Sequence, residues 1–218
     1  MAIQIMGNGS VIGEIESNTR AQRVVLRSFD FGSLGIYRAS HLSGVMAAGL
    51  ASDSEIFQFR WTHASNLALI GRVRLDGLGG SATAFAAGHG KIDMVAARGW
   101  SADGSGGTAM TITGDNQSLR TSMGTTLAGA IRGSSTAALT AGTKTLDAQP
   151  MGLYAFAVGT VVSVQYATDV DLFNGMSGGL NYPLVLAQNE GFVVRATVPA
   201  TGTWQYGITV EWAEVTSY

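Results

Sequence analysis

Apolar and polar residues alternate along several short stretches of the chain, most clearly near its end. In residues 204–212 one face carries Trp204, Tyr206, Ile208, Val210 and Trp212, and the other carries Gln205, Gly207, Thr209 and Glu211. Because successive side chains of a strand point to opposite faces, this pattern predicts a strand with one buried face. A second alternating run, 192–198, precedes a Pro-Ala-Thr-Gly turn at 199–202, and together they predict an antiparallel hairpin. A turn at 188–191 would extend this hairpin to 183–187 as a three-stranded meander.

The same alternation predicts further strands throughout the chain. They lie at 57–61, 67–75, 154–158 and 162–166, with shorter candidates at 2–6, 23–29, 92–98 and 109–113. Many short strands joined by glycine-rich turns are typical of a sandwich or barrel. The best helix candidate is 40–51, but Gly44 and Gly49 each cost a helix about 1 kcal/mol relative to alanine. We therefore expect a single all-β domain over 1–218, an antiparallel β-sandwich with long Gly/Ser/Thr-rich loops.

The segment 108–150 differs from the rest of the chain in its amino-acid composition. It is rich in Thr, Ala, Ser and Gly and has too few large apolar side chains to form a core of its own. We expect a long excursion or loop insertion that lies on the sandwich or on a neighbouring molecule, and a flexible linker is the alternative. Arg120 and Arg132 are its only arginines. Both are candidate partner contacts, although an ordinary surface position would explain them equally well.

Charged residues make up only 13% of the chain, and the net charge is −2. A nucleic-acid partner is not expected, because such binding needs a basic face that displaces counterions. A surface with so few charges is poorly protected against association. The composition therefore favours a protein that is covered by copies of itself or by other proteins. A surface solvated through Ser, Thr and Gly is the alternative.

The chain contains no cysteine, which excludes disulfides, thiolate metal sites and cysteine nucleophiles. Its first residues, MAIQIMGNGS, lack the basic and apolar regions of a secretory signal. No apolar run approaches the ~20 residues of a membrane helix. The expectation is a protein made in a cytoplasm, without a membrane partner.

Two glycine-rich stretches match motifs of catalytic or cofactor sites but lack the required context. Residues 175–179 match the G-x-S-x-G nucleophile elbow, yet Pro183 argues against the helix that must follow, and all three histidines precede the serine. Residues 77–82 match G-x-G-x-x-A after a predicted strand, but a glycine-broken sequence follows and no βαβ alternation occurs elsewhere. We interpret the first as a turn and the second as a hairpin loop.

The segment 169–175 resembles part of a calcium-binding loop. Leu172 and Phe173 interrupt the alternating oxygen ligands that such a loop needs, and no glutamate follows at the twelfth position. A cation bound by Asp169 and Asp171 is the alternative to a simple turn. The histidines lack metal-binding spacing, so no metal or cofactor is expected, although a triad assembled by the fold stays open.

Aromatic and acidic residues are the groups that a glycan-binding or glycosidase site would use. Glu211 and Glu214 cannot be assigned as a catalytic carboxylate pair from spacing alone. Trp100 precedes a glycine-rich loop and is the candidate for an exposed aromatic contact. The remaining tryptophans occupy alternating strand positions and are predicted to be core residues: Trp61, Trp204 and Trp212.

Two long stretches carry a resemblance to a known group of proteins. They are RTSMGTTLAGAIRGSSTAALTAGTKTLDAQP at 120–150 and PLVLAQNEGFVVRATVPATGTWQYGITVEWAEV at 183–215. With the Gly/Thr/Ala-rich texture of strands and loops, the chain resembles virion structural proteins of tailed bacteriophages, especially capsid decoration (cement) proteins with a jelly-roll-like sandwich.

The resemblance implies a non-enzymatic protein that forms homotrimers and binds the major capsid protein on the outer surface of the phage head. It carries over no catalytic residue. A glycan- or receptor-binding module of a phage tail is the alternative, and it predicts an exposed aromatic such as Trp100. An enzyme, for example a glycosidase, would require two close acids in a cleft.

Overall fold

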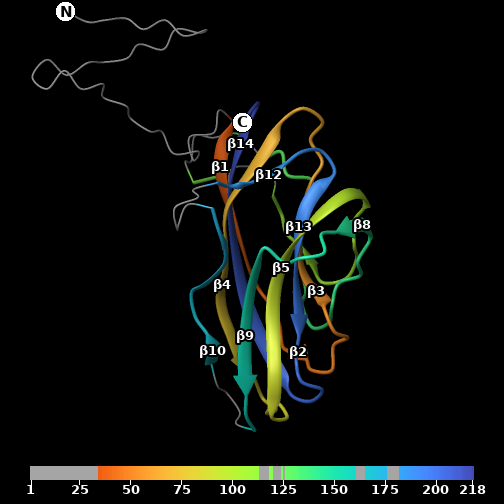
Figure 1. Cartoon of the computed structure of the whole chain (residues 1–218), viewed down its shortest axis with the longest axis vertical. Helices are drawn as coiled ribbons and strands as arrows, with labels where there is room; N and C mark the ends of the chain where they lie inside the picture. Colours follow the sequence, from red (N-terminus) through yellow and green to blue (C-terminus); the bar gives the residue numbers. More distant parts are fainter. Residues whose placement is uncertain (1–33, 113–117, 120–123, 125, 161–164, 176–181) are drawn as a thin grey trace, which may run out of the picture.

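In a computed structural model, the chain folds into two antiparallel β-sheets that pack face to face (Figure 1). The structure describes residues 34–112, 118–119, 124, 126–160, 165–175 and 182–218, and these form strands and loops without a helix. The expected all-β antiparallel sandwich is therefore confirmed. The strands expected at 2–6 and 23–29 lie outside the described residues.

The first sheet, called sheet one, is built around two long strands. Its strand order is β1 (Gly35–Leu42), β14 (Thr203–Val215), β4 (Leu67–Gly80) and β10 (Gln165–Ala167). Three shorter strands complete it: β11 (Val170–Asn174) and β12 (Leu184–Leu186) pair with β4, and β2 (Met46–Ala47) pairs with β14. The helix candidate 40–51 is thus the end of β1 followed by β2.

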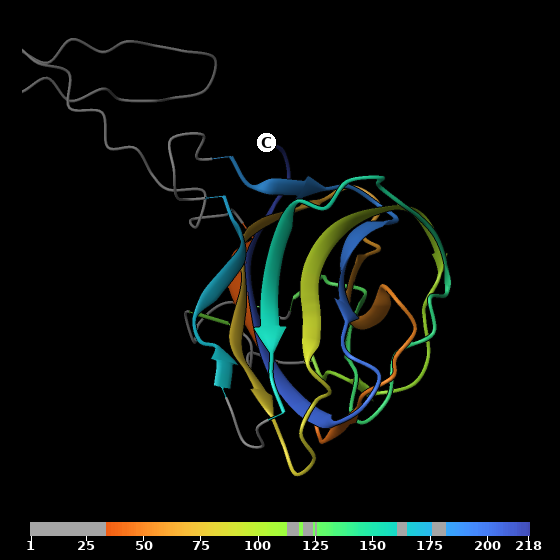
Figure 2. The ribbon, with the colours of Figure 1, turned by 60° about the horizontal axis from the view of Figure 1, so that its bottom comes forward.

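The second sheet, called sheet two, faces sheet one across the core (Figure 2). Its order is β6 (Thr108–Ala109), β7 (Ala130–Gly133), β3 (Ser54–Trp61), β13 (Glu190–Thr197), β5 (Gly88–Ala102) and β8 (Thr143–Leu146). The strand β9 (Gly152–Val158) also pairs with β5. Because β5 is long, β9 pairs with its first half and β8 with its second half.

The hairpin expected at 192–212 is wrong, although both strands exist. β13 pairs with β3 and β5 in sheet two, whereas β14 pairs with β1 and β4 in sheet one, so residues 198–202 cross between the sheets. The physical reason is that β13 is covered on both faces, with Phe192 and Val193 equally buried, and therefore takes a central place in its own sheet. The expected meander is wrong too, because β12 pairs with β4.

The core lies between the sheets and is dominated by aromatic side chains. Trp61, Trp204 and Trp212 are buried, as predicted. Trp212 of sheet one meets Phe59 of sheet two edge-on, with ring centroids 5.2 Å apart. The Tyr206 hydroxyl also joins the layers, donating to the Ile56 carbonyl at 2.6 Å. Burial raises the pKa of Tyr206, so this hydroxyl stays protonated as a donor.

The described parts of 108–150 pack on the sandwich. They contribute β6, β7 and β8, and Ile131 and Leu139 are buried. The backbone N–H of Leu139 donates to the Glu55 carbonyl at 2.8 Å, which holds the stretch after β7 against β3. The residues 113–117, 120–123 and 125 lie outside the described residues. Where it is described, the excursion extends sheet two through β6, β7 and β8, and it also contacts β14 of sheet one through Leu127 and Ser134.

Candidate functional surfaces

The expectation that Trp100 is exposed is wrong. The side chain is only 1% exposed and packs in a small cluster with Val95, Val193 and Leu146 on the outside of sheet two. Its indole N–H donates to the Ala102 carbonyl at 3.0 Å, and the Lys144 ammonium lies 4.5 Å from a ring centroid. β8 and its lysine, distant in sequence, cover the ring. The ring is therefore closed to a sugar.

Of the three candidate contact residues, the two that the structure describes, Trp100 and Arg132, do not form one site. Arg132 lies on β7 and donates to the Gly106 carbonyl at 2.6 Å, which ties it to the adjoining loop. Trp100 lies on β5, separated from β7 by β3 and β13. Arg120 lies outside the described residues. A role for either arginine in partner contact stays a prediction.

Charged residues gather on the outer face of sheet two, where each carboxylate has a cationic partner. Lys144 Nζ lies 2.8 Å from Glu55 Oε2, and both side chains are almost completely buried. Nearby, Asp93 accepts two hydrogen bonds from Arg195, at 2.8 and 2.9 Å, and pairs with Lys91 at 3.2 Å. These pairs attach β8 to β3 and β13 to β5. They stabilise the fold, and in the described part of sheet two they engage the Glu55 and Asp93 carboxylates.

The possible cation site at Asp169 and Asp171 is occupied by arginines. Arg72 Nε lies 2.6 Å from Asp171, and Arg74 Nη1 lies 3.6 Å from Asp169. Within the described ranges, no three His, Asp or Glu side chains come together as metal ligands. Of the elbow motif 175–179, only Gly175 is described. No described helix is long and apolar enough to cross a membrane.

Glu214 is a buried carboxylate that sequence reasoning could not place. It accepts hydrogen bonds from the Thr126 hydroxyl, from the Leu127 backbone N–H at 3.0 Å and from the Trp212 indole N–H at 3.1 Å. These hydrogen bonds hold residues 126–127, which precede β7, against β14. Desolvation is the largest influence on its pKa and raises it, against the opposing effect of these hydrogen bonds. A carboxylate enclosed in this way is not open to a substrate.

The raised pKa of Glu214 makes a testable contribution to stability. A carboxyl whose pKa is higher in the folded state binds its proton more tightly in that state. Its contribution to the free energy of unfolding is therefore complete below the unfolded-state pKa, about 4.3, and is lost as the pH rises through the folded-state pKa. We expect the stability of the wild type relative to Glu214→Gln to fall as pH rises above about 4, by at most about 1.4 kcal/mol per pH unit. Urea unfolding of both proteins across pH measures this difference, and a difference independent of pH would contradict it.

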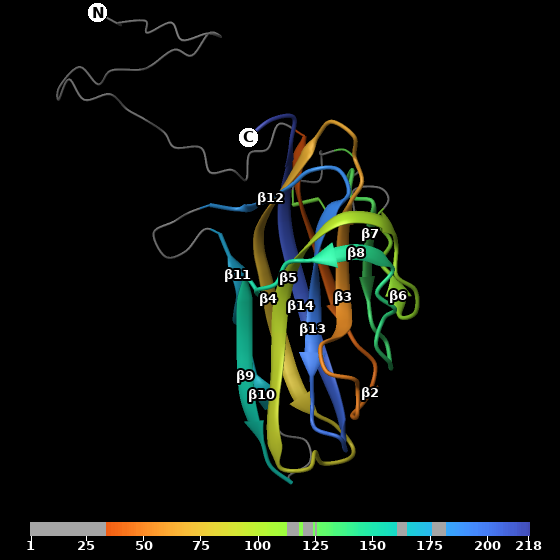
Figure 3. The same ribbon diagram turned by 45° about the vertical axis from the view of Figure 1, so that its right-hand side comes forward.

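β9 exposes an apolar face at the margin of the sandwich. Tyr154, Phe156 and Val158 point into the core or its edge, whereas Leu153 is 57% exposed and the alternate alanines, Ala155 and Ala157, are also exposed. Met151, just before the strand, is exposed as well. We call Met151, Leu153, Ala155 and Ala157 the β9 strip. Figure 3 places β9 beside β10 and β11 at this margin.

The β9 strip has the properties of a contact surface. Its strand has neighbours in sheet two along β5 only, within the described residues. At its start it approaches β11 so closely that a Cβ on Gly152 would overlap the Leu172 carbonyl. A strand that is apolar on both faces normally has both faces buried. When such a strand lies at a sheet edge with one apolar face exposed to solvent, that face favours association with another protein molecule. The sequence GLYAFAV, in which the Tyr154 hydroxyl is the only polar side-chain group, indicates a strand that is apolar on both faces.

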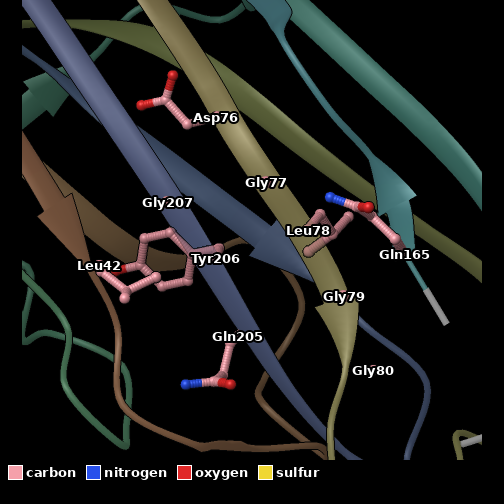
Figure 4. Close-up of a pocket in the computed structure, with 10 residues that line it drawn as sticks. All are labelled: Leu42, Asp76, Gly77, Leu78, Gly79, Gly80, Gln165, Gln205, Tyr206 and Gly207. Carbon is pink, nitrogen blue, oxygen red and sulfur yellow. The ribbon is translucent and has the colours of Figure 1, made fainter. Parts of the chain in front are cut away.

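A hollow of about 350 Å³ lies on the outer face of sheet one, over β4 and β14 (Figure 4). Its floor is formed by glycines, and its border by side chains from β1, β4, β10 and β14: Leu42, Asp76, Gln165 and Gln205. The glycines at 77–80, expected in a hairpin loop, belong to β4 and pair with residues 204–207 of β14. The loop interpretation is therefore wrong, and the missing side chains leave an open space on a rigid sheet.

Comparison with known proteins gave no significant match, whether to a family model, to a curated protein or to a solved structure. The features that bear on function are therefore the chain's own surfaces, chiefly the β9 strip and the hollow over β4 and β14.

Proposed function

We propose that this chain is a non-enzymatic structural protein of a tailed-phage virion. In this proposal it is a jelly-roll-like capsid decoration protein that assembles as a homotrimer and binds the major capsid protein on the outside of the head. The observation that carries the proposal is the β9 strip, an apolar surface on an edge strand of a chain with 13% charged residues. Such a surface suits a protein that functions in contact with copies of itself.

The chemistry of the strip favours assembly over small-ligand binding. Leu153 offers a large apolar side chain, and the alanines beside it allow another backbone to approach closely. The strip carries no hydrogen-bonding side chain that could orient a small molecule, whereas removal of apolar area from water favours association by about 25 cal/mol per Å² before the entropic cost of association is subtracted. The strip lies next to β5, where Lys91 sits opposite Ala155 and supplies a partly exposed polar side chain at its border.

Other observations count against a glycosidase that uses Glu211 and Glu214 and against a glycan-binding module that uses Trp100. Glu214 is enclosed by its hydrogen-bond partners, so the Glu211 and Glu214 pair does not flank a cleft. Trp100, the expected sugar platform, is covered by Lys144.

The first experiment is to measure molar mass by light scattering during size-exclusion chromatography. We expect three times the chain mass of 22.6 kDa. Leu153→Asp should shift the protein to monomer, because it places a charge within the apolar contact. The matched control is Leu42→Asp, which changes an exposed leucine on sheet one and should leave the trimer intact.

Two results would contradict the proposal. One is a wild-type protein that stays monomeric at all concentrations and does not sediment with empty capsids of the phage that encodes it. The other is a Leu153→Asp variant that keeps the full trimer mass, which would remove the β9 strip from the assembly surface.

A further inference from the structure

We infer that the hollow over β4 and β14 is a binding site for a neutral saccharide. This inference is independent of the proposed assembly, because the hollow lies on sheet one and the β9 strip lies on sheet two. The site is defined by Asp76, Gln165 and Gln205 as polar groups, by Leu42 as an apolar border and by glycines as its floor.

Two glycines of the floor, Gly77 and Gly207, show no structural requirement for glycine. Gly77 and Gly207 lie directly opposite each other on β4 and β14, beside the bulge residue Asp76. Neither has the positive φ that favours glycine. A Cβ on Gly77 would meet nothing within 4 Å, and a Cβ on Gly207 would make only an ordinary contact, 3.5 Å from the Asp76 side chain. Because glycine weakens a strand, these positions are better explained by the close approach of something outside the chain.

The backbone around the hollow excludes recognition by strand addition. β4 and β14 pair with each other along their length, and at the hollow β1 and β10 flank them, with Leu42 opposite Gly207 and Gln165 opposite Gly79. Their backbone N–H and C=O groups are therefore used within sheet one. An extended peptide needs a free sheet edge, so a ligand here must be recognised by side chains.

The charges around the hollow exclude ionic ligands. Among the described residues, no lysine or arginine borders it. Arg74, on the same strand as Asp76, is paired with Asp76 and, at 3.6 Å, with Asp169. An anion would therefore meet the Asp76 carboxylate, whose counter-charge Arg74 is already engaged. A metal ion would find one carboxylate, which already accepts hydrogen bonds from Arg74 and Thr209. The site therefore suits an uncharged ligand.

The polar groups are those that bind hydroxyl groups. Gln165 is exposed, and in Figure 4 its amide is directed from β10 over the glycines of β4. Gln205 makes one long contact, 3.4 Å from its Nε2 to the Ser43 carbonyl, and so keeps most of its hydrogen-bonding capacity. Asp76 is fixed by Arg74 and Thr209 and retains acceptor capacity.

A sugar ring matches this combination. Its hydroxyl groups both donate and accept, which satisfies two amides and a carboxylate, and its C–H face can lie against Leu42, which is 74% exposed. A purely apolar ligand would leave the polar groups desolvated and unpaired. The volume of about 350 Å³ is at the lower end of the range for small-molecule sites, so we expect a ligand of one or two sugar units.

The test uses ligand-observed NMR and calorimetry on the full chain with a panel of neutral saccharides. The panel contains glucose, galactose, N-acetylglucosamine, lactose, maltose and chitobiose, with sialic acid and inorganic phosphate as anionic probes. We expect at least one neutral sugar to bind with a Kd of about 1 mM and the anionic probes not to bind. Gly77→Leu should fill the hollow and weaken that binding at least tenfold.

The matched control is Gly159→Leu, the same change at a glycine outside the hollow whose Cβ also meets nothing within 4 Å. It should bind like the wild type. If Gly77→Leu does not fold, Gln165→Ala and Gln205→Ala replace it and should each weaken binding. Absence of binding by every neutral sugar, or equal affinity of the wild type and these hollow variants, would overturn the inference and leave the assembly proposal untouched.

Discussion

Replacement of Asp93 by asparagine should destabilise the protein by about 3 kcal/mol, at the lower end of the range for breaking a buried ion pair. Asp93 is 1% exposed and accepts both hydrogen bonds of the Arg195 guanidinium. Asparagine preserves the shape but removes the negative charge, so it leaves Arg195, with a side chain 18% exposed, without its nearest counter-charge. Urea unfolding gives the free energy directly.

A second Arg–Asp pair provides the control for this prediction. Arg98 also donates two hydrogen bonds to Asp147, at 2.8 and 3.0 Å, but the Asp147 side chain is 37% exposed. Water can replace the lost interaction there, so Asp147→Asn should cost less than about 1 kcal/mol. Equal effects of the two substitutions would show that burial does not set the strength of the Asp93 pair.

The Asp93 pair also bears on the register of sheet two. Arg195 lies directly opposite Asp93 where β13 pairs with β5. A slip of one residue would turn Arg195 toward the core and Ala196 toward the outer face. The pair therefore penalises the wrong register, in a strand that is apolar at most positions and that would otherwise be poorly specified.

The sequence predicted most strands but not their neighbours. Alternation from Trp204 to Trp212 identified β14 and its buried face, because burial leaves a period of two in the sequence. It could not show that β14 pairs with β4 while β13 pairs with β3 and β5, since alternation defines the faces of a strand and contains no information about its edges. The short turn at 199–202 suggested a hairpin, but a chain crossing between sheets can be equally short.

The candidate sites depended on contacts between distant segments and were therefore hidden. Trp100 is covered by Lys144, which belongs to a segment whose composition gave no sign of its position. The hollow arises because Gly77 on β4 faces Gly207 on β14, a juxtaposition that only the strand register reveals. The β9 strip is the exception, because a strand with both faces apolar can be recognised from residues 152–158 alone.

Replacement of Trp212 by alanine should cost about 4 kcal/mol, the typical loss for a large aromatic removed from a core. Trp212 meets Phe59 of sheet two at 5.2 Å and stacks on Tyr37 of sheet one at 5.7 Å. Its indole also donates to Glu214, so the substitution removes one of the hydrogen bonds that hold the buried carboxylate. Because the ring lies between the layers, the loss should appear as faster amide exchange in both sheets.

Trp100→Ala separates this global effect from a local one. Trp100 is as buried as Trp212, but it belongs to a small cluster on the outside of sheet two, under β8 and Lys144. Its removal should accelerate amide exchange mainly in β8 and the adjoining end of β5, and should lower the free energy of unfolding less than Trp212→Ala does. Equal acceleration in β4 and β14 by the two variants would contradict a division into an inter-sheet core and an outer cluster.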